Sequence, residues 1–296
     1  MPDEQDIPDK SLKEDSAAEP TVPDSTIFPL DPQPKDMEVH HHPDLHHSPK
    51  PWKEYILEFI MIFLAVTLGF FAETIREHIS ENGKAKELAE SLYKEVYSDS
   101  VNIQKILITR ARKEEELDQF ISYMRDSSLI NVSDRFYRSF AWSFLISSTV
   151  LFEPADGMLN QLRNSGSLRY FKSNKLQSEI GELSVSIAKV RSRMAVEFGI
   201  IAQDLRPLSI KFYDFRWNEE LTKNGSINLL DALISQPAPT RKAIILNMKD
   251  FNRLEAENAA SYYRLAFKAT KIIQLKNYVE INHKLLETLR TEYQIE

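Results

Sequence analysis

The residues best suited to chemistry in this sequence are histidines, and five of the seven lie in one short tract. The tract runs His40-His41-His42-Pro43-Asp44-Leu45-His46-His47. Neutral imidazole is a common ligand of Zn²⁺, Ni²⁺ and Cu²⁺, so the tract is a candidate metal site. A flexible run that lacks groups to orient the rings would bind such an ion weakly. The alternative interpretation is a polar spacer whose charge responds to pH. The candidate metal ligands are His40, His41, His42, His46 and His47.

A second candidate site is the turn between Leu159 and Lys172, where basic residues surround a glycine. Guanidinium groups, together with free backbone N–H groups near a helix start, can hold an anion. The same residue types are equally typical of a helix that stops at Gly166 and continues as a solvated turn. The candidate anion-binding residues are Arg163, Asn164, Gly166, Arg169 and Lys172.

Catalytic motifs are missing from the sequence. It contains no G-x-S-x-G, Walker loop, H-E-x-x-H or dinucleotide fingerprint, and no cysteine. Outside the tract only His78 and His283 remain. Glu280 and His283 make one E-x-x-H pair, whereas a di-metal centre in a helical bundle needs two. We therefore predict no enzymatic activity and no cofactor.

The net charge of −7 belongs to the first 53 residues, which hold 12 acidic and 5 basic side chains. The remaining residues carry 32 of each sign. Because phosphate binding needs a concentrated basic field, this balance argues against a nucleic-acid partner. Ten of the 14 prolines also fall in residues 1–53, and apolar residues there are isolated. We expect residues 1–53 to be a disordered acidic tail.

The apolar stretch from Ile56 to Ala72 predicts a transmembrane helix within residues 54–74. Its 17 residues span about 26 Å as a helix, which is the short end of what crosses a bilayer. Trp52 and Tyr55 precede it as interfacial anchors. A buried core helix and a cleaved signal peptide are the alternatives, and a signal-anchor fits the 50 polar residues in front better. Predicted lipid-facing or helix-contact residues are Ile56, Phe59, Phe63, Ala65, Gly69 and Ala72, where Ala65 and Gly69 permit close helix contact.

Helical periodicity continues after the span. We expect a juxtamembrane helix and hinge over residues 75–84, broken at Asn82-Gly83, and an elongated antiparallel helical bundle over residues 85–296. The whole chain is therefore predicted to be all-α. The expected helices cover residues 88–126, 136–151, 154–162, 176–205 and 241–292, with a kink or stop at Pro207.

Two patterns predict which faces of these helices are buried. The stripe in residues 176–205 includes Met194, Phe198 and Ile201, and the stripe in the last helix includes Met248, Phe251, Tyr262, Leu265, Ala269, Ile272, Val279 and Leu286. The charged run from Arg110 through Lys113 to Glu116 is expected to be a solvated face with pairs four residues apart.

The segment from Trp52 to Glu73, continuing to Arg76-Glu77, resembles an uncharacterised family of bacterial single-span proteins with a W-K-E-Y-x-x-E-F-x-x-I-F opening to the span. The turn from Leu162 to Leu176 is similar to that family's L-x-x-S-G-x-L-R-x-I-K-N-x-x-L element, with Tyr170 and Phe171 in its hydrophobic middle. The family carries no assigned activity. The resemblance implies a bacterial inner membrane and a single span followed by a helical domain.

The predicted partners are the lipid bilayer and either another protein or a second copy of the chain. The favoured function is a membrane-anchored interaction or scaffold protein. An extracytoplasmic sensor that binds a small anion at Arg163 and Arg169 is the alternative. Charges on the two sides of the span are nearly even, and we favour a cytoplasmic tail with an extracytoplasmic bundle.

Overall fold

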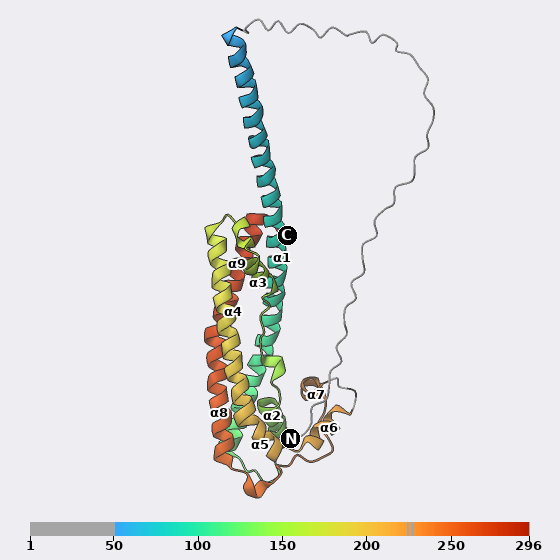
Figure 1. Ribbon diagram of the computed structural model, residues 1–296. Helices are drawn as coiled ribbons and strands as arrows, with labels where there is room; N and C mark the ends of the chain where they lie inside the picture. Colours follow the sequence, from blue (N-terminus) through green and yellow to red (C-terminus); the bar gives the residue numbers. More distant parts are fainter. Residues whose placement is uncertain (1–50, 224, 226–227, 296) are drawn as a thin grey trace, which may run out of the picture. The chain divides into compact units, whose positions relative to one another are not determined.

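The computed structural model describes residues 51–223, 225 and 228–295 (Figure 1). Every element within these residues is helical, apart from an isolated bridge between Tyr213 and Ile245, which confirms the all-α class. Nearly all of the tail predicted to be disordered lies outside the described residues. The elements are α1 (Trp52–Asp126), α2 (Asp134–Phe144), η1 (Ser148–Val150), α3 (Gly157–Asn164), η2 (Ser167–Tyr170), α4 (Asn174–Ile200), η3 (Ile201–Leu205), α5 (Arg206–Phe212), α6 (Phe215–Thr222), α7 (Leu229–Ser235), η4 (Met248–Asp250), α8 (Arg253–Ala269), η5 (Thr270–Leu275) and α9 (Lys276–Tyr293).

The chain divides into two units, residues 1–62 and residues 63–296. The described part of the first unit is the start of α1. The second unit holds the rest of α1 and all the other helices.

Helix α1 continues through Asn82 and Gly83, so the predicted break there is wrong. A glycine in a helix interior costs only about 1 kcal/mol relative to alanine, and Glu81, Lys84 and Ala85 beside the Asn82-Gly83 pair are good helix formers. Packing supports the helix immediately afterwards, because Ala85, Ala89 and Leu92 are buried. Local propensity is therefore overridden by the contacts of the next turns.

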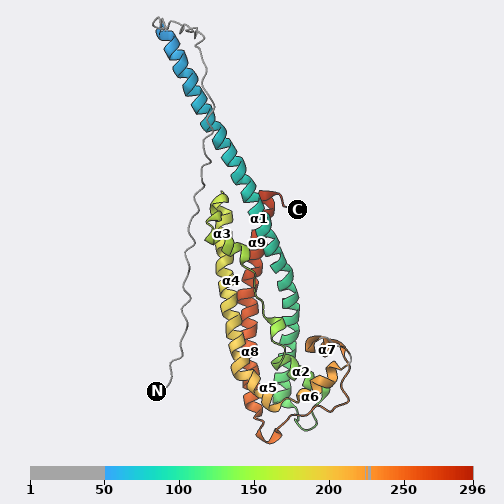
Figure 2. The ribbon, with the colours of Figure 1, turned by 45° about the vertical axis from the view of Figure 1, so that its right-hand side comes forward.

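Helix α4 packs along α9 and α8, as the contacts between them and both ribbon views show (Figures 1 and 2). The buried apolar residues of the second unit form two cores. The first core joins the end of α1 with α2 and α5–α8 around Phe120, Phe140 and Trp217. The second core joins the middle of α1 with α3, α4 and α9 around Leu92, Ile180 and Leu285.

The C-terminal helix begins at Arg253, not at Arg241 as predicted. The Asn252 side chain accepts hydrogen bonds from the backbone N–H groups of Leu254 and Glu255, which fixes the helix start. Residues 241–247 form no helix, and Leu246 N–H donates to the Phe212 carbonyl at 2.9 Å.

The predicted buried stripe of this helix is also wrong in its first half. Tyr262, Leu265 and Ile272 are exposed, whereas Ala260, Tyr263 and Phe267 are buried. Helix α8 has two apolar faces. The buried face carries three alanines beside Tyr263 and Phe267, and alanine lets a neighbouring helix approach closely.

Pro207 neither ends nor breaks the helical path after α4. A π-helical segment, η3, lies directly before α5, and Pro207 occupies the first turn of α5. Proline lacks the N–H that an α-turn requires and its ring crowds the carbonyl four residues earlier. The carbonyl four residues before Pro207 lies in η3, where the wider π-turn leaves more room for the ring. A second π segment, η5, joins α8 to α9.

Candidate functional site

The turn that was predicted to bind an anion has the helix stop at its glycine that the sequence also predicts. Helix α3 ends at Asn164, and Gly166 adopts a left-handed conformation with φ of +68°. Ser173 caps the next helix, because its hydroxyl accepts from the N–H of Leu176 at 3.2 Å. The turn is therefore an ordinary helix stop followed by a capped helix start.

The cations of this turn each have a separate partner. Arg163 donates to the Ser184 hydroxyl at 3.0 Å, and Arg169 donates to the Tyr170 hydroxyl at 3.2 Å. Lys172 lies 3.7 Å from a Glu81 carboxylate oxygen. Asn164 is exposed. The structure thus brings these residues into one turn without directing the three cations at one point.

The predicted membrane residues all lie in α1 and all are exposed: Ile56, Phe59, Phe63, Ala65, Gly69 and Ala72. This part of α1 is long and apolar enough to cross a membrane by length and composition. A Cβ added at Gly69 would meet no heavy atom within 4 Å.

The five histidines of the predicted metal tract, residues 40–47, lie outside the described residues. His283 is exposed and its Nδ1 lies 3.9 Å from Glu287, four residues along the same helix. Within the described residues no three potential ligands gather in the arrangement a metal ion needs.

The largest departure from the sequence-based expectations is a buried ionic cluster of Arg110, Lys113 and Glu197. All three side chains are fully enclosed, so the prediction that Arg110 and Lys113 belong to a solvated face is wrong, and it is wrong for Glu116 as well, which is also buried. Arg112, between them, does pair with Glu116 at 2.6 Å as predicted. Glu197, and not the predicted Phe198, points into the core from α4.

Arg110 is held by four hydrogen bonds. Its Nη2 and Nη1 donate to the two carboxylate oxygens of Glu197 at 2.7 and 3.0 Å. Its Nη1 also donates to the Val150 carbonyl at 2.8 Å, and its Nη2 to the Phe267 carbonyl at 3.0 Å. The guanidinium carbon lies 3.7 Å from the centre of the Phe267 ring. This residue therefore ties α1 to the end of α4, to α8 and to the end of η1.

Lys113 lies one turn further along α1. Its Nζ donates to the Ile146 carbonyl and lies 4.8 Å from the centre of the Tyr263 ring. Burial lowers the pKa of Lys113 to about 7, and Arg110 adds to this shift while Glu197 opposes it. Burial also raises the pKa of the Tyr263 hydroxyl well above its usual value.

The ionic cluster separates the two apolar cores. Along α1, Ile103 belongs to the second core and Leu117 to the first. Along α4, Met194 belongs to the second core and Ile200 to the first. The π segment η3 starts shortly after Glu197, and η5 starts shortly after Phe267, whose carbonyl accepts a hydrogen bond from Arg110. Irregular turns of this kind often mark functional positions.

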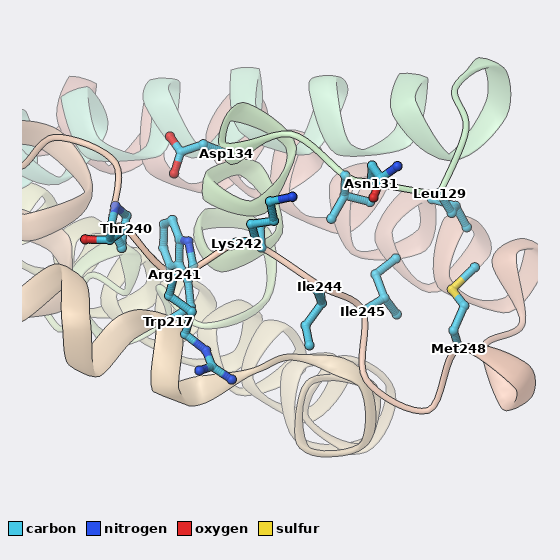
Figure 3. A pocket seen from close by; sticks show the side chains of 13 residues that line it. Leu129, Asn131, Asp134, Trp217, Thr240, Arg241, Lys242, Ile244, Ile245 and Met248 are labelled. Carbon is cyan, nitrogen blue, oxygen red and sulfur yellow. The ribbon is translucent and has the colours of Figure 1, made fainter.

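An open pocket of about 520 Å³ lies beside the non-helical segment that follows α7 (Figure 3). Side chains from the loop after α1, the start of α2, α6 and residues 239–248 surround it. Asp134 is paired with Arg138 at 2.8 Å, and Arg241 with Asp214 at 2.7 Å. These pairings leave Lys242 as the basic group in the lining without an ion pair among the described residues, and nothing here resembles a nucleophile with its base.

A third feature is an uncovered apolar face, which we call the α8 stripe. Its large side chains are 55–69% exposed. The α8 stripe comprises Leu254, Tyr262, Leu265, Ile272 and Ile273. A contiguous exposed apolar face on a folded protein commonly marks an interaction surface.

Comparison of the chain with protein-family models, with curated proteins and with solved structures finds no match.

Proposed function

We propose that the chain is a single-span membrane protein whose later helices form an elongated antiparallel bundle that binds another protein or a second copy of itself. It acts as an anchored interaction or scaffold protein and carries out no reaction of its own. The observation that supports this role most directly is the α8 stripe, because the bundle leaves it uncovered while burying the opposite face of the same helix.

The membrane part of the proposal is supported by the exposure of the first third of α1. Phe59, Phe63 and Phe70 are exposed, as are the aliphatic residues between them. Water is a poor solvent for such a surface, since each large apolar side chain gains roughly 1.5–3 kcal/mol on leaving it. The hydrocarbon core of a bilayer supplies the matching environment.

The interaction part is supported by the charges beside the α8 stripe. Arg264 pairs with Asp118, and Lys271 pairs with Glu114 at 2.5 Å. These pairs join α8 to α1 and leave the stripe as an uncharged surface. An apolar centre with a polar border is the usual arrangement of a protein–protein interface.

We place the protein in a bacterial inner membrane, with the tail in the cytoplasm and the bundle outside it. Single cysteines at Ser25 and Ile108 test this orientation in intact cells, because the chain has no native cysteine. A membrane-impermeant maleimide should label Ile108→Cys and spare Ser25→Cys. The opposite labelling would place the bundle in the cytoplasm.

Site-specific photo-crosslinking tests the interaction role. A benzophenone amino acid at Leu265 of the full-length protein in native membranes should give discrete adducts of higher mass. The same group at Ile108, which is 73% exposed on α1, is the matched control and should give far fewer. Equal, diffuse labelling at the two positions, or no adduct at Leu265, would refute the role.

A further inference from the structure

We propose that a pocket between α1, η2 and the end of α9 binds the headgroup of an anionic phospholipid in the membrane that α1 crosses. The inference rests on the proposed function, because it takes the start of α1 as a membrane span, and it deepens that function by naming a second contact with lipid. We call this pocket, of about 370 Å³, the headgroup pocket. Its lining includes Asn82, Lys86, Tyr170, Lys172, Glu292 and Tyr293.

The headgroup pocket lies where α1 first meets the other helices. The described residues of α1 before Glu81 are all exposed. Lys172 Nζ lies 3.7 Å from a Glu81 carboxylate oxygen and 3.4 Å from His78 Nδ1, which joins the segment after η2 to α1. The Ser173 hydroxyl donates to Glu292 at 2.8 Å, which joins the same segment to α9. Three segments far apart in the sequence therefore enclose the pocket.

The position of the headgroup pocket along α1 matches the depth of lipid headgroups. A hydrocarbon core of about 30 Å needs about 20 helical residues, so a span that begins at Ile56 ends near Ile75. Asn82 follows seven residues later, about 10 Å along the helix, and the headgroup layer is about 5–8 Å thick. Helical side chains also lean toward the N-terminus, which is the membrane side of α1. Lipid headgroups are thus at high local concentration beside the pocket.

The charge around the headgroup pocket favours an anionic lipid. Residues 157–174 contain three cations, Arg163, Arg169 and Lys172, and no acid. Residues 73–86 of α1 carry three acidic and three basic side chains, which cancel. Arg290 and Glu292 cancel in the same way near the end of α9. A cation beside an anionic membrane surface strengthens the contact about fivefold, so the three cations without matching acids favour a headgroup with a net negative charge.

The spread of these cations favours a lipid layer over one small anion. Arg163 and Arg169 donate to the separate hydroxyls of Ser184 and Tyr170. A small anion needs several donors directed at one point, whereas a layer of headgroups presents phosphates over a broad area. Tyr170, whose ring centre lies 5.6 Å from Lys84 Nζ, is a residue type enriched at membrane interfaces. One lipid therefore fits the pocket while its neighbours meet the other cations.

Selective fluorescence quenching in nanodiscs tests the headgroup pocket with the full-length protein. Ser80→Cys carries a fluorophore on α1, outside the pocket lining, in a chain without any other cysteine. The discs contain phosphatidylcholine with a trace of either phosphatidylglycerol or phosphatidylcholine that bears a nitroxide near the glycerol backbone. The nitroxide phosphatidylglycerol should quench with about tenfold higher apparent affinity, because Lys86 and Lys172 attract its headgroup and Glu292 opposes them.

Two pairs of substitutions separate the pocket from a general effect of charge. Lys86→Gln with Lys172→Gln should make the two nitroxide lipids quench alike. Lys242→Gln with Lys249→Gln is the matched control, because it removes two exposed lysines near η4, away from the start of α1 (Figure 1). The control should keep the full selectivity. All four lysines are exposed, so neither pair should change the melting temperature.

Equal quenching by the two lipids, or selectivity that survives the loss of Lys86 and Lys172, would overturn the headgroup pocket and retain the membrane span. Displacement of the nitroxide phosphatidylglycerol by an excess of inorganic phosphate would overturn the lipid as the ligand. Absence of quenching by either lipid would overturn the span and the pocket together.

Discussion

At the scale of single residues, Lys113 shows how burial changes the chemistry of a common surface side chain. It is fully enclosed beside Arg110, which is also positively charged, and among the described residues Glu197 is the anion that opposes the resulting shift. Burial therefore lowers the pKa of Lys113 to about 7, with a smaller contribution from Arg110 that Glu197 opposes.

The stability of the protein should consequently rise with pH. Lys113 has a pKa of about 7 when folded and 10.5 in its ordinary state, so the unfolded chain binds more protons between these values. The free energy of unfolding should increase by up to about 1.4 kcal/mol per pH unit above pH 7 from this group alone. Below pH 7 both states are protonated and this contribution is constant.

The measurement is the difference in unfolding free energy between the wild-type protein and Lys113→Met, in detergent, at pH 7.5 and 9.5. Methionine keeps the length of the side chain without the charge. The advantage of the methionine variant should shrink as the pH rises, because the wild-type lysine loses its charge. A difference that is independent of pH would mean that Lys113 is hydrated and charged.

Glu197 is the single anion at the centre of the ionic cluster. Glu197→Ala leaves Arg110 buried without its carboxylate partner, and breaking a buried pair on one side typically costs about 3–5 kcal/mol. Chemical denaturation with circular dichroism should show this loss. Glu287→Ala, at an exposed position on α9, is the control and should change stability by less than about 0.5 kcal/mol. Similar effects of the two substitutions would show that the cluster adds nothing to stability.

At the scale of the helices, Gly83 tests whether α1 is one continuous element. The glycine is helical, and an added Cβ would meet no heavy atom within 4 Å. Gly83→Ala should therefore raise stability by about 0.5–1 kcal/mol by restricting the unfolded chain. Thermal melting of the full-length protein in detergent measures this change.

Gly166→Ala is the matched control, because the φ of +68° at Gly166 is unfavourable for alanine. It should lower the melting temperature. A loss of stability at Gly83 as well would indicate that α1 needs a bend there, as the Asn82-Gly83 pair suggested.

The helical class, the stop before Gly166 and the apolar start of α1 could be predicted from periodicity and residue type. The buried ionic cluster could not, although Arg110, Lys113 and Leu117 continue the spacing of the buried residues along α1. Charge normally indicates a solvated face, and the partners that permit burial lie 87 and 157 residues away, at Glu197 and Phe267. Likewise, hydrophobicity could not decide which face of α8 is buried, because both faces are apolar and the choice depends on how closely α4 approaches.

At the scale of the whole molecule, we propose that lipid solvates the start of α1 and that water surrounds the packed helices. Two groups of large apolar side chains are exposed among the described residues, those of residues 56–72 of α1 and those of the α8 stripe. We assign the first to lipid and the second to another protein chain. The ionic cluster between the two cores holds α1, α4 and α8 together, so it supports the helix that carries the α8 stripe.

The central claim is that residues 56–72 are solvated by lipid, and alkaline carbonate extraction of membranes tests it most directly. The wild-type protein should stay with the membrane pellet and be released by detergent. Leu64→Arg with Leu68→Arg should release the protein, since each central arginine costs roughly 2.5–3.5 kcal/mol of insertion free energy. Ile108→Arg with Ile234→Arg, at exposed positions beyond the span, should remain in the pellet. Recovery of the wild-type protein in the soluble fraction without detergent would contradict the account.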